Sequence, residues 1–136
     1  MIRIKIVQND VKTVAKVVLI DQKNRTLFLK RSDYVLKYAG DWDLPGGHLK
    51  ENESIISGLA REVEEETGLT VAEPKFLSKI DNLNFFYAMY DSQELQLSHE
   101  HTEYRFFEKK ELDPKEKFQR VALAALEVIE NANINN

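Results

Sequence analysis

Runs of apolar residues along the chain predict the strands of a sheet. Residues 11–21 are dominated by Val, Ile and Ala, and Val17 to Ile20 are continuously apolar, as in a strand that is buried on both faces. The polar residues 21–24 predict a turn, and residues 26–30 predict the returning strand. By similar patterns, further strands are expected at residues 69–71, 75–80, 84–90 and 104–107.

One segment in the middle of the chain has apolar residues at helical spacing. Residues 54–67 carry a single apolar stripe, which is typical of a helix that packs one face on a core. Asn52 or Ser54 can cap the start of this helix. Gly68 stands just past its end, where a left-handed residue is favoured.

A second helix is expected near the C-terminal end. Asp113 is a capping residue, Pro114 fits the first helical position, and Glu116 follows three residues after the cap. One apolar face then runs from Phe118 to Ile129. Strands and two helices in this order predict an α/β (α+β) fold in which a mixed β-sheet is sandwiched between helices. The length of 136 residues predicts a single domain over residues 1–136.

The segment between the second predicted strand and the first predicted helix has no regular period. Residues 33–47 combine aromatic residues with glycine and proline, and we expect a long irregular loop there. Loops of this length within a compact domain usually have a function.

Charge and cysteine content narrow the classes of function. The chain has 19 Lys and Arg against 23 Asp and Glu, a formal net charge of −4, so it lacks the basic surface expected of a nucleic-acid-binding protein. It has no cysteine, which excludes disulfides and thiolate metal sites and fits a cytoplasmic location. No segment approaches the roughly 20 apolar residues of a membrane span.

Three glutamates of the first predicted helix lie close together. Each helical residue turns the chain by about 100°, so Glu62, Glu65 and Glu66 fall within roughly 100° of arc. Such a run is usually a solvated face, although like charges at this spacing and acids near a helix C-terminus are both unfavourable. A cation between the carboxylates would offset these penalties. Hard oxygen donors favour Mg²⁺ or Mn²⁺, and such an ion can neutralise diphosphate oxygens while water attacks phosphorus.

The segment from Gly47 to Leu69 resembles the signature of the Nudix (MutT-like) hydrolase family. In that signature a Gly and a Glu precede an Arg-Glu-aliphatic triplet, which is followed by Glu-Glu and by Gly-aliphatic. The chain matches it at each specified position and spacing, with Gly47, Glu53, Arg61, Glu62, Val63, Glu65, Glu66, Gly68 and Leu69. Residues 42–47 are also similar to the family's usual lead-in. The resemblance is specific for about residues 42–69.

The resemblance implies a Nudix fold and metal-dependent hydrolysis of a diphosphate linkage in a nucleoside diphosphate derivative. Glu62, Glu65 and Glu66 would ligate Mg²⁺ or Mn²⁺, with the carbonyl of Gly47 as a further ligand. Glu62 or Glu66 is also a candidate general base.

Two other residues of the signature have a supporting role by the same resemblance. Glu53 and Arg61 would pair with each other and hold the loop–helix–loop segment rigid. His48, His99 and His101 are scattered along the chain, and we interpret them as surface or structural residues.

A further carboxylate is expected from outside the signature, as similar enzymes often have. Residues 100–106 resemble a recurrent family pattern headed by Glu, with Phe106 in place of the more usual Trp. Alternate side chains of a strand face opposite sides, so Glu100 and Glu103 would not serve the same position. We expect Glu100 to be the metal ligand or the base.

Residues outside the signature would bind the substrate. In similar proteins an Arg at the position of Arg31 faces the substrate phosphates. Tyr38, Trp42 and Phe85 are candidates for stacking on a base, as are Tyr34 and Phe86, and Trp42 is expected to be partly a structural brace. The sequence leaves the substrate open among nucleoside triphosphates, ADP-ribose, nucleotide sugars, dinucleoside polyphosphates and capped RNA ends.

Two alternatives share the fold but not the reaction. One is a catalytically inactive Nudix-fold module that binds a nucleotide and regulates a partner, and the complete glutamate set argues against it. The other is an isomerase of the isopentenyl-diphosphate type, whose site resembles a Cys and Glu pair that this chain lacks. We therefore expect a small nucleotide as the partner rather than nucleic acid or a membrane. A homodimer is one of the oligomeric states left open.

Overall fold

The computed structural model describes residues 12–32, 41–91 and 93–134. In these ranges, strands β1 (Val14–Ile20) and β6 (Leu83–Met89) run parallel to each other in the middle of the sheet. Strand β2 (Thr26–Arg31) pairs antiparallel with β1, and β5 (Lys75–Ile80) pairs antiparallel with β6. The predicted mixed sheet is confirmed, and β1 is buried at each of its positions, as its apolar run predicted.

Three more strands pair with β1 and β2. Strands β3 (Trp42–Asp43) and β7 (His101–Phe107) both pair antiparallel with β2, and β4 (Gly46–His48) pairs antiparallel with β1. The prediction of an irregular loop over residues 33–47 was therefore wrong for residues 42–43 and 46–47, which form strands, while residues 41, 44 and 45 are irregular. Strands of two or three residues are too short to leave an alternation that a sequence pattern can reveal.

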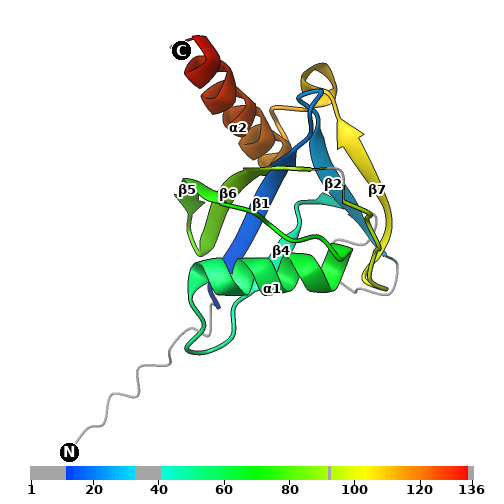
Figure 1. The fold of residues 1–136 in the computed structure, drawn as a ribbon, viewed down its shortest axis with the longest axis vertical. Coiled ribbons are helices and arrows are strands. Elements are labelled where there is room, and N and C mark those ends of the chain that lie inside the picture. Colours follow the sequence, from blue (N-terminus) through cyan, green and yellow to red (C-terminus); the bar gives the residue numbers. More distant parts are fainter. Residues whose placement is uncertain (1–11, 33–40, 92, 135–136) are drawn as a thin grey trace, which may run out of the picture.

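The two long helices lie on opposite faces of the sheet (Figure 1). Helix α1 (Ile55–Thr67) starts after Ser54, whose hydroxyl accepts a hydrogen bond from the Ser57 amide at 3.2 Å. It ends at Gly68 in the left-handed conformation, as predicted. The buried stripe of α1 packs against the sheet residues Ala15, Val17, Leu19, Leu27, Leu29, Phe86 and Ala88.

Helix α2 (Lys117–Ile134) covers the other face. Its buried residues include Val121, Ala122, Ala125 and Leu126, which pack with Val18, Ile20, Phe28, Leu44, Phe85 and Phe107. The short helix η1 (Lys109–Glu111) leads from β7 toward α2. The expected sandwich of a sheet between helices is confirmed.

Helix α2 begins later than the capping pattern at Asp113 predicted. The Asp113 carboxylate accepts a hydrogen bond from the Lys115 amide, so it closes a local turn and not the helix. The Glu116 carboxylate instead accepts from the Gln119 amide at 2.8 Å, and the Glu116 carbonyl accepts from the Arg120 amide. Glu116 thus satisfies an amide of the first helical turn, and Pro114 precedes the helix.

The strand predicted at residues 69–71 is not formed. The Thr70 amide donates to the Gln93 side chain at 3.0 Å, and the Gln93 amide group donates back to the Thr70 carbonyl. The Leu69 amide donates to the Thr67 hydroxyl. These backbone groups therefore find side-chain partners in place of a strand ladder. Among the described residues, no helix is long and apolar enough to cross a bilayer.

Replacing Gly68 tests the end of α1. Gly68 has a φ of +73° and its amide bonds to the Glu64 carbonyl, while a Cβ there would meet no atom closer than 3.8 Å. We expect Gly68→Ala to lower the free energy of unfolding by about 1 kcal/mol through backbone strain alone. Urea unfolding followed by circular dichroism measures this, and an unchanged midpoint would contradict the assigned cap.

Candidate active site

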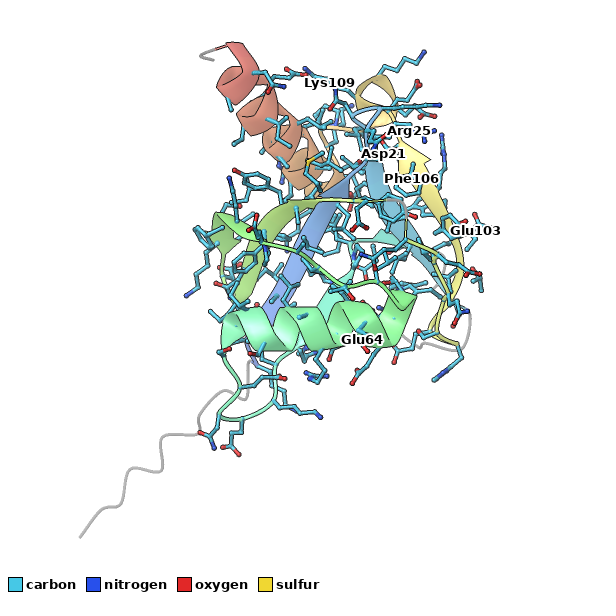
Figure 2. All side chains as sticks on the ribbon, in the orientation of Figure 1. Asp21, Arg25, Glu64, Glu103, Phe106 and Lys109 are labelled. Atoms are coloured by element: carbon cyan, nitrogen blue, oxygen red, sulfur yellow. The ribbon has the colours of Figure 1, made fainter. Side chains whose placement is uncertain are left out.

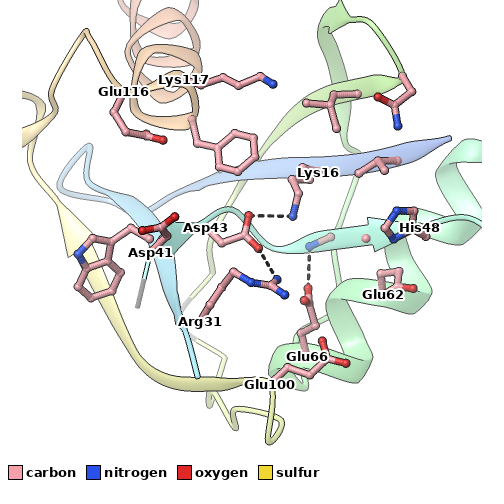
Figure 3. A pocket seen from close by; sticks show the side chains of 17 residues that line it. Lys16, Arg31, Asp41, Asp43, His48, Glu62, Glu66, Glu100, Glu116 and Lys117 are labelled. Carbon is pink, nitrogen blue, oxygen red and sulfur yellow. Dashed lines mark hydrogen bonds and ion pairs between the residues drawn. The ribbon is translucent and has the colours of Figure 1, made fainter. Parts of the chain in front are cut away.

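A cavity of about 780 Å³ opens between the C-terminal half of α1, the start of α2 and the sheet (Figure 3). The signature contributes Gly47, Glu62 and Glu66 to its lining, its lead-in contributes Gly46, and Glu100 enters it from the segment before β7. The structure thus brings together the carboxylates from two segments that are far apart in the sequence. Glu65, which was also expected as a ligand, does not line this cavity.

The pairing of β4 with β1 places the backbone of Gly46 and Gly47 beside the glutamates. Gly46 has a φ of +129°, and a Cβ there would lie 2.1 Å from the Ala15 carbonyl oxygen. A Cβ on Gly47 would lie 2.6 Å from a carboxylate oxygen of Glu62. Only glycine allows β1 and α1 to approach this segment so closely.

Glu66 is the most buried of the signature carboxylates. Its side chain accepts a hydrogen bond from the Gly46 amide at 2.7 Å, and the residue is 5% exposed. Burial raises the pKa of Glu66 to about 8, although Lys16 and the Gly46 amide both favour its charged form. A carboxylate with such a pKa inside a cavity is a candidate for binding a cation or exchanging a proton.

Arg61 and Glu53 form the predicted pair. The Arg61 Nε and Nη2 atoms donate to the two oxygens of Glu53 at 2.7 and 2.9 Å, and Nη2 also reaches the His48 carbonyl. The hydrogen bond from Arg61 holds the pKa of Glu53 at about 2. This bidentate pair ties α1 to the loop before it, as the resemblance implied.

The two remaining signature glutamates also contact Arg61. Its Nη1 atom lies 3.1 Å from Glu62 and 3.2 Å from Glu65, whose side chain is 57% exposed. Of the described residues, no three acidic or histidine side chains are close enough to hold one metal ion. Glu62, Glu66 and Glu100 carry the oxygen donors that a hard divalent ion prefers. Their spacing in the structure does not form such a group, so this ligand set stays a prediction.

The structure places Glu100 and Glu103 differently, as expected, but a β-bulge separates them and not the alternation of a regular strand. β7 is bulged opposite Lys30 and Arg31, so Glu103 pairs with Lys30 while His101 pairs with Arg31. Glu100 lies before this bulge, lines the cavity, and its carbonyl accepts from the Ser32 amide. Glu103 points outward from the edge of the sheet (Figure 2). The different positions of the two glutamates therefore result from this bulge.

Of the aromatic residues expected to contact the substrate, Trp42 lines the cavity and Phe85 does not. Phe85 is fully buried in the core under α2, with its ring 6.0 Å from that of Phe118. The prediction that Phe85 stacks on a base was therefore wrong, because α2 covers the face of β6 on which this side chain lies. Trp42 does line the cavity, and its ring packs edge-on against Phe107 at 5.4 Å, as a brace would. Tyr38 lies outside the described residues, and Phe86 is buried on the α1 face.

Lys16 and Asp43 are polar residues of the site that sequence reasoning did not find, whereas Arg31 was expected there. Lys16 and Arg31 line the cavity and both form ion pairs with Asp43, at 2.8 and 3.3 Å. Burial opposes the charge on Asp43, but Lys16, His101 and Arg31 lower its pKa to about 2. The signal for Lys16 was present in the sequence: one charge within a buried apolar strand needs a buried partner.

His101 lies behind these carboxylates. Its Nε2 atom is 3.9 Å from Asp43 and 3.9 Å from Glu66, and the ring is completely buried. Neither ring nitrogen has a hydrogen-bond partner among the described residues. The structure therefore places His101 inside the fold beside the site, whereas His48 and His99 are exposed.

Replacing Glu66 tests its unfavourable burial. Because the folded-state pKa is about 8 against an ordinary 4.5, this group's contribution to stability is present below pH 4.5 and lost as the pH rises toward 8. We expect Glu66→Gln to raise the Tm in EDTA by at least about 4 °C at pH 8, which corresponds to ~1 kcal/mol in a domain of this size. The gain should shrink toward pH 4.5.

The matched control is Glu64→Gln, which removes the same charge from the exposed side of the same helix. It should show no comparable dependence on pH. A Glu66 variant with the pH profile of the wild type would contradict the raised pKa.

Comparisons with known proteins show what this chain is similar to. The 8-oxo-dGTP diphosphatase of Buchnera aphidicola is 37% identical over 71 residues, covering 51% of this chain and 50% of that protein. The chain spans about half or less of the length of the curated relatives it matches.

Solved structures extend the likeness over most of the chain. The MutT protein of Methanosarcina mazei Go1 is 27% identical with a TM-score of 0.67, covering 90% of this chain and 94% of that one. The fold is also that of an ADP-ribose pyrophosphatase from Streptococcus suis, with 23% identity, a TM-score of 0.71, and 86% and 90% coverage. The model of the NUDIX domain matches residues 11–130, so this chain belongs to the NUDIX family.

Proposed function

We propose that this chain hydrolyses a diphosphate linkage in a nucleoside diphosphate derivative and requires Mg²⁺ or Mn²⁺ to do so. The observation that carries the proposal is the convergence of Glu62, Glu66 and Glu100 on one cavity, with Glu66 buried and its pKa raised to about 8. Solvated surface glutamates would have neither property. The names of the relatives support the same class of reaction.

The site residues divide the work between cation binding and support. Glu62, Glu66 and Glu100 would hold the metal ion, with the Gly47 carbonyl as a further donor. The bound ion would neutralise phosphate charge and make a water molecule a better nucleophile. Glu62 or Glu66 would accept the proton of the attacking water, because both line the cavity.

The remaining residues would position the substrate or the glutamates. Arg31 would contact a phosphate group, and the half-exposed ring of Trp42 would contact the nucleoside part. Arg61, held by Glu53, would keep α1 and the preceding loop in register. Glu65 would act at most at the edge of the site, since its exposed carboxylate contacts Arg61. A cytoplasmic location and a homodimer stay predictions from the sequence.

A substrate panel tests the reaction itself. With Mg²⁺ or Mn²⁺ at mildly alkaline pH, we expect the protein to cleave at least one of 8-oxo-dGTP, ADP-ribose, a nucleotide sugar and a dinucleoside polyphosphate. Mass spectrometry should identify a nucleoside monophosphate among the products. Glu62→Gln and Glu66→Gln should each lower turnover by at least about a hundredfold, the usual scale for losing a proton-transferring or charge-stabilising group.

The exposed Glu64→Gln variant again serves as the control and should keep normal turnover. If the wild-type protein binds these nucleotides but cleaves none of them, the alternative of an inactive binding module takes the place of the hydrolase.

A second comparison separates the two glutamates near β7. Glu100 lines the cavity and Glu103 points outward, so Glu100→Gln should weaken the response to Mn²⁺ about tenfold or more, in line with loss of one metal ligand or its support. Glu103→Gln should leave it unchanged. Titration of turnover against Mn²⁺ concentration gives the result for both variants, and the reverse order would reject Glu100 as a ligand.

A further inference from the structure

Lys16 is an unusual residue for its position. It lies in β1 between apolar residues that are almost all fully buried, yet it carries a charge and is only 8% exposed. Its Nζ atom lies on the wall of the cavity described above. Taking an ammonium group out of water is costly unless it is paired, so the contacts of Lys16 are informative.

Asp43 holds Lys16 and Arg31 at the same time. Its Oδ1 atom accepts from the Lys16 ammonium at 2.8 Å, and its Oδ2 atom lies 3.3 Å from Nη1 of Arg31. Lys16 also donates to the Leu44 carbonyl at 3.1 Å. The Asp43 side chain is 5% exposed, so both of its oxygens face these cations and not the solvent.

This arrangement places two cations on the lining of the cavity beside one ionised carboxylate. Two cations share one carboxylate, and the pKa of about 2 keeps Asp43 ionised at neutral pH. An ammonium has three N–H donors, and the hydrogen bonds of Lys16 to the described residues use two. Figure 3 shows Lys16, Asp43 and Arg31 between the glutamates on one side and Glu116 and Lys117 of the α2 end on the other.

We propose that Lys16, anchored by Asp43 beside Arg31, is a further anion-binding residue of this site and completes with Arg31 a subsite for a phosphate group of the substrate's diphosphate chain. The proposal rests on the proposed function, because it takes the diphosphate as the ligand of this cavity. Lys16 is a contact that neither the signature nor its resemblance indicates. The geometry assigns it from its place on the cavity lining between the glutamates and the start of α2 (Figure 3).

The chemistry of the pair suits a phosphate group. A guanidinium presents several donors in a plane, and an ammonium acts as a compact point charge, so together they can contact different oxygens of one oxyanion. An anchored cation also loses less conformational entropy on binding than a free surface lysine. Phe118 lies beside Lys16, with its ring centre 5.5 Å from Nζ, which limits the water that competes for the ammonium.

A purely structural ion pair is the competing explanation, and binding of methylenediphosphonate separates the two. This non-hydrolysable diphosphate is titrated into the isotope-labelled full chain, and its binding is followed by NMR, first with EDTA and then with Mg²⁺. Lys16→Met should weaken its binding by about tenfold or more, the effect of losing one charge-assisted hydrogen bond. Lys75→Met removes an exposed lysine of β5 and should change binding by less than about twofold, since surface charges are screened.

The double variant Lys16→Met with Asp43→Asn provides the decisive readout. Lys16→Met alone leaves Asp43 without its closest partner and should lower the Tm. The added Asp43→Asn change removes the buried charge and should recover part of that loss. In the subsite proposal, phosphonate binding stays weak in the double variant although stability returns. Recovery of both binding and stability would show that Lys16 only neutralises Asp43, and would overturn the proposal.

Measuring the turnover of the same variants distinguishes failure of the phosphate subsite from failure of the proposed hydrolase reaction. A higher KM with little change in kcat for Lys16→Met supports both the phosphate subsite and the hydrolase reaction. Normal hydrolysis with unchanged KM and phosphonate binding in Lys16→Met rejects the subsite alone. Absence of hydrolysis in the wild type, with phosphonate binding that depends on Lys16, rejects the hydrolase and keeps the subsite. A wild type that does not bind methylenediphosphonate with or without Mg²⁺ rejects the subsite.

Discussion

The pairing of β4 with β1 is the constraint on which the site depends. Lys16 stands opposite Gly46 in this ladder, and a side chain at Gly46 would collide with the Ala15 carbonyl at 2.1 Å. The close approach turns the Gly46 amide toward Glu66, 2.7 Å away. The same short segment brings Asp43 to Lys16. One backbone contact thus sets the positions of the buried acid and of the cations across the cavity.

Two buried carboxylates near this contact have opposite electrostatic states. Burial acts against the charge of both Glu66 and Asp43, but Asp43 has Lys16 and Arg31 at ion-pair distance. Its pKa therefore falls to about 2, while that of Glu66 rises to about 8. For Glu66, the Lys16 charge and the Gly46 amide offset only part of the desolvation, and the charges of Asp43 and Glu62 raise its pKa further. Both acids are buried, so their different pKa values come from the neighbouring charges and not from burial alone.

Local rules predicted the parts of the fold and site that local interactions determine. The ends of α1 at Ser54 and Gly68 follow from a cap and a left-handed residue. The pair Arg61–Glu53, which the family resemblance implied, also lies within one loop–helix segment. Lys16 and Asp43 are 27 residues apart, and their contact depends on strand pairing that no short pattern encodes. Phe85 was misassigned because the aromatic residue type does not reveal that helices cover both faces of β6.

The irregular features of the strands have the largest effect on the site. The bulge of β7 opposite Lys30 and Arg31 lets Glu100 face the cavity while the buried ring of His101 follows directly. That ring has two nitrogens without a hydrogen-bond partner among the described residues, and an unsatisfied buried group of this kind costs about 1–3 kcal/mol. Glu66 adds a second unfavourable burial beside it. Neither feature stabilises the fold. Glu66 lines the cavity and His101 lies 3.9 Å behind it, which is the pattern expected where a chain gives up stability for a binding or catalytic site.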